Sequence, residues 1–195
     1  AEAQYIVARK TLADTKIRRG DLLIKAAAKL RKKRNDFIIG IVGSKDELDL
    51  ELRTLASNLG IKDSIHFFGK VTDEVLSTLY SESLAVIHLV KEAPFGLIVI
   101  ESMSCGTPVI SWKPGGPEET IIDGETGFLI CENDEEELIK KIEVFLDNPE
   151  LSMLMGKNAR KQVLSNFDLD KHHKIMRTHL LDVIQNKHNN TYNTN

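Results

Sequence analysis

The sequence predicts an α/β protein of three layers, in which helices cover both faces of a six-stranded parallel sheet. Two observations support this fold class. Short apolar runs rich in β-branched residues alternate along the chain with longer segments of helical periodicity. Parallel neighbours need crossover connections, so strands that alternate with helices favour a parallel sheet. The predicted strands are residues 5–8, 37–42, 65–68, 84–89, 107–111 and 127–130.

Helical periodicity predicts the elements between and after these strands. Four segments repeat apolar residues every three or four positions, so each is expected to bury one face. A capping box over residues 44–47 opens the second helix, and acidic residues after Asn133 give the third a capped start that suits the helix dipole. The buried positions are Leu22, Leu23, Ala26, Ala27 and Leu30, then Leu48, Leu52, Leu55 and Ala56, then Leu138, Ile139, Ile142 and Leu146, and finally Ile175, Met176, Leu180, Val183 and Ile184.

Composition and charge exclude several classes of protein. Hydrophobic residues make up 42% of the chain and charged residues 28%, which is ordinary for a globular protein. The net charge of -3 gives no argument for nucleic acid, and the basic cluster at residues 31–34 ends a predicted helix, where cations suit the dipole. No apolar run is long enough to cross a bilayer, and residues 1–9 lack the pattern of a signal peptide.

Cys105 and Cys131 form no close metal-like pair, and the six histidines show no metal-ligand spacing. We therefore expect reduced cysteines that serve packing, a cytoplasmic protein, no metal and no cofactor. A domain over residues 1–187 is expected, followed by a disordered polar tail at 188–195. The chain reads either as a self-sufficient domain or as half of a two-domain enzyme.

In open parallel sheets, ligands bind beyond the carboxyl ends of the strands, where the strand order reverses. This rule points to the loops that begin at Arg9, Gly43, Gly69, Val90 and Lys113. The fourth loop leads into a helix whose amino terminus offers unpaired N–H groups to a diphosphate or sugar, and Gly96 allows a close approach. Glu101 follows within that helix, where a carboxylate suits a ribose diol; the alternative is a solvated helix residue. Neither a Walker A loop nor a Gly-x-Gly-x-x-Gly fingerprint follows a strand.

A chain of motifs in one order carries a family resemblance. The motifs are Pro94-Phe-Gly-Leu97, Glu101-Ser-Met-Ser-Cys-Gly-Thr-Pro-Val-Ile110, Gly115-Gly116 followed by Glu119, and Asp123-Gly124-x-x-Gly127-Phe128-Leu129. Together they resemble the carboxyl-terminal, nucleotide-sugar-binding domain of the family 4 retaining glycosyltransferases, over residues 5–184. The resemblance implies a Rossmann-like domain that forms one half of a GT-B fold.

The resemblance also implies roles for individual residues. The residue matching Glu101 binds the nucleotide ribose, and the backbone of the loop before the helix holds the sugar and the diphosphate. A basic pair, matched by Arg9 and Arg19, neutralises the diphosphate as it leaves, and no metal is needed. The remaining donor-binding positions are Phe95, Gly96, Leu97, Gly43, Lys70 and Val71.

Three departures from the family pattern bear on these roles. The first glutamate of the family's pair falls on Ala93, and the nearest carboxylate is Glu92, which we interpret as a catalytic residue moved by one position. The usual Gly-Arg is Ala8-Arg9, and a longer loop lets Lys16 and Arg18 compete with Arg19. The phosphate-loop match at Gly43 is short. His88 ends a buried strand near the crevice, as a packing residue or a site residue.

The leading hypothesis is transfer of a hexosyl group from a nucleoside diphosphate sugar to a carbohydrate or lipid-linked acceptor. This chain supplies the donor-binding half, and an amino-terminal domain recognises the acceptor. The resemblance allows peripheral attachment of a full-length protein to the inner face of the membrane. One alternative is a non-catalytic nucleotide-sugar-binding or interaction module of the same fold. A sugar-nucleotide epimerase is a weaker alternative, disfavoured by Pro94-Phe-Gly-Leu97 and Glu101.

Overall fold

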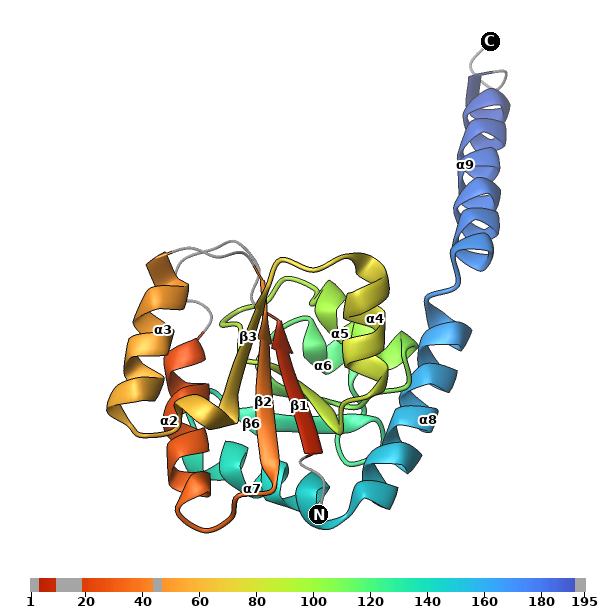
Figure 1. Cartoon of the computed structure of the whole chain (residues 1–195). Helices are drawn as coiled ribbons and strands as arrows, with labels where there is room; N and C mark the ends of the chain where they lie inside the picture. The colour runs from red at the N-terminus through yellow and green to blue at the C-terminus, as the bar shows by residue number, and fades with distance from the viewer. Residues whose placement is uncertain (1–3, 10–18, 44–46, 192–195) are drawn as a thin grey trace. The chain divides into compact units, whose positions relative to one another are not determined.

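A computed structural model describes residues 4–9, 19–43 and 47–191 (Figure 1). The backbone contacts divide the chain into two compact units, residues 1–160 and residues 161–195. The first unit contains the whole sheet and the helices that cover it. The capping box predicted at residues 44–47 falls largely outside the described residues.

The sheet has six parallel strands in the order β3-β2-β1-β4-β5-β6. This order belongs to doubly wound, Rossmann-like sheets. All six predicted strands are confirmed; the strand at 37–42 has the predicted ends, and the ends of the others differ by at most two residues. The largest difference is at β5, which begins two residues later than predicted, because Thr107 and Pro108 lie in the connection before the strand. The strands are β1 (Gln4–Arg9), β2 (Phe37–Val42), β3 (Ile65–Gly69), β4 (Ala85–His88), β5 (Val109–Lys113) and β6 (Gly127–Cys131).

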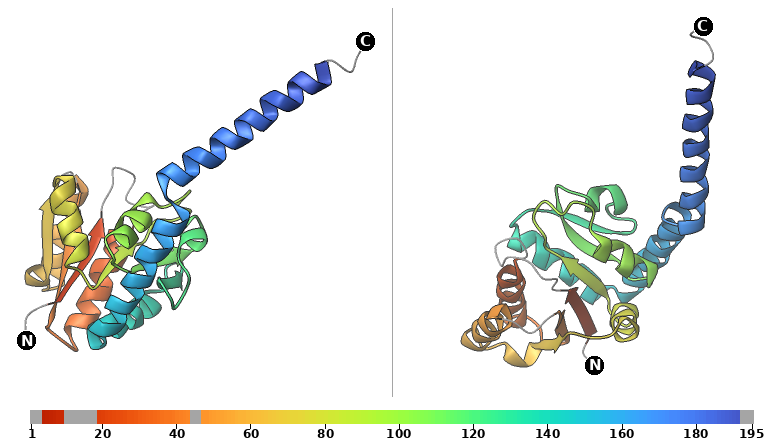
Figure 2. Two further views of the ribbon diagram at one scale, coloured as in Figure 1. Left: turned by 90° about the vertical axis from the view of Figure 1, so that its right-hand side faces the viewer. Right: turned by 90° about the horizontal axis from the view of Figure 1, so that it is seen from above.

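Helices form a layer on each face of the sheet (Figures 1 and 2). One layer consists of α2 (Gly20–Arg31), α3 (Glu47–Asn58) and α7 (Glu135–Asp147). The other consists of α4 (Asp73–Ser81), α5 (Leu97–Ser104) and α6 (Pro117–Thr120). A short 3₁₀ helix, η1 (Lys62–Ser64), precedes β3. This arrangement confirms the predicted three-layer α/β fold.

The core explains why these segments form these elements. Alternate residues of the strands, such as Ile39, Ile87 and Ile110, point into one apolar cluster with the stripes of α2 and α7. Leu30 and Leu138 in those stripes are fully buried, as predicted. The opposite face of β4 and β5 presents Val86, His88 and Ser111 to the second helical layer.

The last two helices are α8 (Pro149–Asn166) and α9 (Leu169–Thr191). The stripe predicted in α9, from Ile175 to Ile184, is exposed rather than buried. The helix runs to Thr191 and so includes residues 188–191, for which a polar tail was expected; residues 192–195 lie outside the described part. No helix of the described residues is both long and apolar enough to cross a membrane.

The predicted capped start of α7 is confirmed. The helix opens after Asn133, which has a left-handed backbone with a φ of 63°, and the Asp134 side chain caps it by accepting a hydrogen bond from the Glu137 N–H at 2.8 Å.

The prediction that both cysteines serve packing was wrong. Cys131 is exposed at the end of an edge strand, and Cys105 is half-buried, so neither thiol is an interior packing residue. Each lies at the end of an element, where apolar sequence neighbours do not imply burial.

Candidate active site at the carboxyl edge of the sheet

The strand order reverses between β1 and β4. The chain moves from β1 to β2 and β3 on one side, then returns to place β4 against the other side of β1. In open parallel sheets, ligands bind at such a switch point, beyond the carboxyl ends of the strands. The loop after β4 is described in full, and the loop and α5 together carry four of the seven predicted donor-binding residues, which are Phe95, Gly96, Leu97 and Glu101.

The β4–α5 loop places backbone, rather than large side chains, at the crevice. Gly96 immediately precedes α5 and has a φ of 80°, a left-handed conformation that glycine adopts without strain. Val99 donates its N–H to the Gly96 carbonyl at 2.8 Å and closes the first turn. Phe95 and Leu97 on either side are exposed, so the amino terminus of α5 is open to a ligand.

Ala93, at the position of the family's first glutamate, and the neighbouring Glu92 differ in exposure. Ala93 is buried, with 4% of its surface exposed, and its carbonyl accepts a hydrogen bond from the Gly116 N–H at 2.8 Å. Glu92 has a left-handed backbone with a φ of 48°, and its side chain is exposed. The loop therefore turns Glu92 outward at the residue before the buried alanine.

The Gly115-Gly116 pair packs backbone against backbone on this loop. A Cβ atom at Gly116 would lie 2.3 Å from the Phe95 Cα atom, far inside van der Waals contact. Gly116 has an ordinary helical φ of -50°, so the close approach, not the backbone angle, requires glycine here. The β5–α6 turn thus fixes the position of the loop in front of α5.

Glu101 lies one turn into α5 and faces α4. Its carboxylate lines a hollow of 360 Å³ between the two helices. The Tyr80 hydroxyl donates to Glu101 Oε2 at 3.4 Å. The hollow is lined by Asp73, Leu76, Ser77, Tyr80, Glu101, Ser104 and Cys105. Glu101 is thus a half-buried carboxylate at a cavity, which favours the binding interpretation over a solvated helix residue.

Arg19 stands immediately before α2 with a φ of 32°. Its Nε and Nη2 atoms donate to the two carboxylate oxygens of Asp21 at 2.9 and 3.3 Å, and its Nη1 atom donates to Asn133 Oδ1. The hydrogen bonds with Asp21 hold the pKa of Arg19 above its ordinary value. Burial acts to raise the pKa of Asp21, but the hydrogen bonds from Arg19 and Lys25 outweigh it and lower that pKa. Both groups are charged at neutral pH.

The β6–α7 turn is a part of the site that the sequence interpretation missed. Glu132 Oε1 lies 3.6 Å from Lys91 Nζ in the β4–α5 loop and accepts from Asn133 Nδ2 at 3.1 Å. Asn133 in turn holds Arg19. The turn therefore links the β4–α5 loop to the start of α2. Its position after the carboxyl end of β6 was the signal, because that edge-strand loop also borders the crevice.

Comparisons with known proteins decide the family. Residues 15–162 match the model of the family described as "Glycosyl transferases group 1". The chain belongs to the group 1 glycosyl transferases. It is 33% identical over 142 residues to an uncharacterized glycosyltransferase of Haemophilus influenzae, covering 72% of this chain and 39% of that protein. It is 32% identical over 174 residues to the N-acetyl-alpha-D-glucosaminyl L-malate synthase of Bacillus anthracis, covering 89% and 45%.

Solved structures agree with this assignment. The sucrose-phosphate synthase of Thermosynechococcus elongatus superposes with a TM-score of 0.81 at 28% identity, covering 93% of this chain and 46% of that one. The structural neighbours are GT-B glycosyltransferases, which confirms the predicted Rossmann-like fold. The chain therefore spans less than half the length of the relatives named here.

Of the remaining predicted residues, those that the structure describes lie at the same edge of the sheet. Arg9 ends β1 beside Val42, but its side chain lies outside the described residues, as do Lys16 and Arg18. Gly43 donates its N–H to the Gly69 carbonyl at 2.9 Å, which joins the β2 and β3 loops. Lys70 is exposed and Val71 half-buried in the loop before α4.

His88, at the end of β4, packs against the β4–α5 loop. It is buried, its Nδ1 atom lies 3.1 Å from Ser111 Oγ, and Ser111 donates to the His88 carbonyl at 3.1 Å. The ring lies against Gly96, since its Cε1 atom is 3.7 Å from where a Cβ would stand. This burial favours the packing interpretation of His88.

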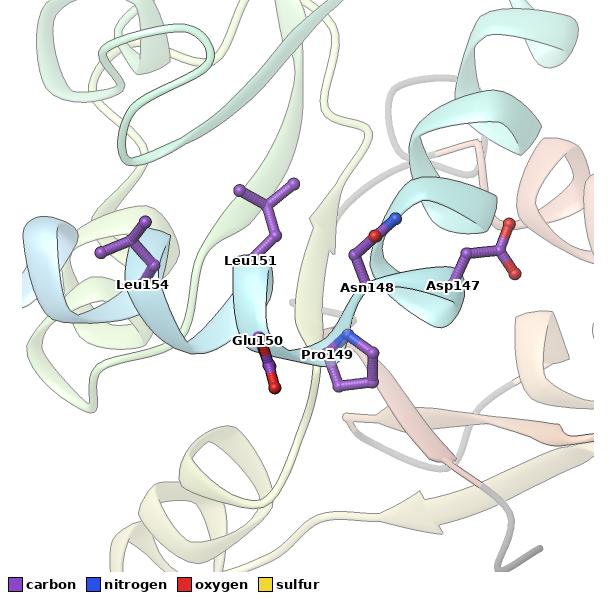
Figure 3. Close-up of a pocket in the computed structure, with 6 residues that line it drawn as sticks. All are labelled: Asp147, Asn148, Pro149, Glu150, Leu151 and Leu154. Carbon is purple, nitrogen blue, oxygen red and sulfur yellow. The ribbon is translucent and has the colours of Figure 1, made fainter.

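A second hollow, of 620 Å³, lies at the opposite edge of the sheet, where α7 ends and α8 begins (Figure 3). It is lined by Asp147, Asn148, Pro149, Glu150, Leu151 and Leu154. Its two carboxylates disfavour an anionic nucleotide. Within the described residues, no group of three or more His, Cys, Asp or Glu is placed to hold a metal ion.

Proposed function

We propose that this chain is the donor-binding half of a family 4 retaining glycosyltransferase, which transfers a hexosyl group from a nucleoside diphosphate sugar to an acceptor. The observation that carries the proposal is the placement of Glu101. It combines a carboxylate at a 360 Å³ hollow with an open helix amino terminus one turn away, beside the switch point of the sheet. Membership in the group 1 glycosyl transferases supports it.

Each part of a nucleotide sugar has a matching group. The Glu101 carboxylate accepts hydrogen bonds from the ribose diol, because an ionised carboxylate offers acceptors only. The backbone of Phe95, Gly96 and Leu97 meets the diphosphate and sugar hydroxyls at the positive end of α5. The loops at Gly43 and at Lys70-Val71 border the nucleoside.

Charge neutralisation falls to Arg9 and Arg19. As the glycosidic bond breaks, negative charge develops on the diphosphate, and preorganised cations stabilise it. Arg19 is held in place by Asp21 and Asn133, with 27% of its side chain exposed. We propose that this pair replaces a bound metal, so that donor binding requires no cofactor.

The rest of the reaction involves groups beyond the donor half. We propose that Glu92 supplies the carboxylate that Ala93 lacks and that an amino-terminal domain binds a carbohydrate or lipid-linked acceptor. We propose a cytoplasmic compartment, which the two free cysteines fit, and, from the family resemblance alone, peripheral attachment of a full-length protein to the inner face of the membrane. A non-catalytic nucleotide-sugar-binding module is the second candidate, favoured by the buried Ala93 and the outward Glu92.

Calorimetric titration of the chain with UDP, GDP and ADP, with and without EDTA, tests the proposal. We expect at least one nucleoside diphosphate to bind, with equal affinity in EDTA. Glu101→Ala should weaken that binding about tenfold or more, through loss of charge-assisted hydrogen bonds to the ribose. Glu125→Ala, which removes an exposed carboxylate before β6, is the matched control and should bind as the wild type does. Absence of binding to all three nucleotides contradicts the proposal.

A further inference from the structure

Tyr80 is a buried side chain with a polar end at the donor site. Only 1% of the residue is exposed, yet its hydroxyl reaches the hollow between α4 and α5 and donates to Glu101 Oε2 at 3.4 Å. A buried tyrosine hydroxyl needs a polar partner. The partner here is the carboxylate to which we assign the ribose.

The backbone of Tyr80 is fixed by a second set of hydrogen bonds. Thr107 Oγ1 donates to the Tyr80 carbonyl at 2.6 Å, and Ser102 Oγ donates to the Thr107 carbonyl at 3.0 Å. Thr107 and Ser102 are both buried. The end of α4, the middle of α5 and the turn before β5 are thereby joined, and Ser102 directly follows Glu101 in the chain.

This network gives the two partners different mobility. The Tyr80 ring is enclosed and has two side-chain torsions, whereas Glu101 has three and is only half-buried. The separation of 3.4 Å is long for an O–H···O hydrogen bond, so a small rotation of Glu101 brings it to the usual range. The hydroxyl is therefore the fixed point, and the carboxylate adjusts to it.

We propose that Tyr80 is a positioning residue for donor binding, which acts by holding the Glu101 carboxylate in the orientation that meets the ribose diol. The inference rests on the proposed function of Glu101. A carboxylate has about four acceptor positions, so one hydrogen bond from Tyr80 leaves room for both ribose hydroxyls. A carboxylate already held in place loses less rotamer freedom when the ligand binds.

Tyr80→Phe tests the inference, because it removes the hydroxyl and keeps the ring. The measurement is calorimetric affinity for UDP, or for GDP or ADP where that binds more tightly, and for the 2′,3′-dideoxy form of the same nucleotide. We expect roughly threefold to tenfold weaker binding of the ribose form and unchanged binding of the dideoxy form. In a Glu101→Ala background, Tyr80→Phe should have no further effect.

Two controls separate positioning from stability. Tyr5→Phe removes a hydroxyl from a partly exposed tyrosine in β1 and should leave both affinities unchanged. The melting temperature of Tyr80→Phe should stay within about 3 °C of the wild type. Equal weakening of ribose and dideoxy forms, an effect that persists in the Glu101→Ala background, or no weakening at all overturns the role of Tyr80 while leaving that of Glu101 intact. Absence of nucleotide binding by the wild type overturns both.

Discussion

At the scale of single residues, Gly116 lets the β5–α6 turn pack closely against the β4–α5 loop, because it has no Cβ atom. Its built Cβ would lie 2.3 Å from the Phe95 Cα atom and 2.6 Å from the Phe95 carbonyl carbon and oxygen, so the backbone must shift. We expect Gly116→Ala to lower the free energy of unfolding by about 1–3 kcal/mol and to weaken nucleoside diphosphate binding, since overpacking displaces the loop before α5. Denaturant unfolding and calorimetry measure the two effects.

Gly60→Ala is the control for this prediction. Gly60 has a φ of 70° with no atom within 4 Å of a built Cβ, so the alanine strains the backbone away from the site. That variant should lose stability and keep its affinity. Wild-type affinity in Gly116→Ala would mean that the loop absorbs the shift without moving the binding groups.

Residues differed in how far the sequence could predict them. Glu101 and Gly96 were predicted because local chain order fixes them relative to α5. Asn133 and Glu132 were missed, because their roles depend on contacts with Arg19 and Lys91, which are far apart in the sequence. Periodicity places a residue on a face, but it does not reveal which distant side chain faces it.

At the scale of elements, ion pairs join the end of α2 to α7. Arg34, just beyond α2, donates to Asp36 Oδ1 and Oδ2 at 2.7 Å each and to Asp147 Oδ1 at 2.6 Å. Lys29 and Lys33 make similar pairs with Glu136 and Glu143 on α7, at 2.9 and 3.2 Å. Lys33 and Arg34 of the basic cluster thus form ion pairs within the protein, in agreement with the absence of a nucleic acid argument in the sequence.

Arg34→Met should lower the free energy of unfolding by about 1 kcal/mol at pH 7, because the methionine keeps much of the apolar stem and loses the bidentate pair. The hydrogen bond from Arg34 lowers the pKa of Asp36 below 3.8. Stability from a lowered carboxylate pKa is complete above the unfolded value and is lost as the pH falls through the folded value. The difference between wild type and variant in urea unfolding should therefore be complete at pH 7 and disappear as the pH is lowered below the ordinary range of an aspartate.

The neighbouring exposed Lys32 provides the control, since Lys32→Met should be close to neutral at both pH values. A difference for Arg34→Met that persists at low pH would assign the effect to packing of the stem.

Periodicity predicted the six strands and the helices α2, α3, α7 and α9, whereas α4, α6 and α8 were not predicted. The ends of the helices were less predictable, because caps such as Asp134 depend on which residue actually leaves the helical conformation.

At the scale of the whole molecule, the first unit gathers the described groups that we propose bind the donor at one edge of its sheet. A parallel sheet could be predicted once strands alternated with helices, but right-handed crossovers allow more than one strand order, so the order came only from the structure. Catalytic competence could not be predicted in the same way, because the nearest carboxylate, Glu92, lies one position away from the family pattern at Ala93. The chain covers 39% and 45% of two of its relatives. Under our proposal, Glu92 is the residue that distinguishes an enzyme from a binding module.

A full-length protein that carries Glu92→Ala decides between these two. If Glu92 replaces the carboxylate absent at Ala93, we expect transfer from the bound nucleotide sugar to slow about a hundredfold, because a group aligned with the reacting centre is lost. Donor affinity should stay within about threefold, since Glu101 and the α5 amino terminus are unchanged. Glu125→Ala serves as the matched control and should transfer normally. Wild-type turnover in Glu92→Ala would remove Glu92 from the catalytic residues, and a wild-type protein that binds donor but transfers nothing to any acceptor would establish the non-catalytic module.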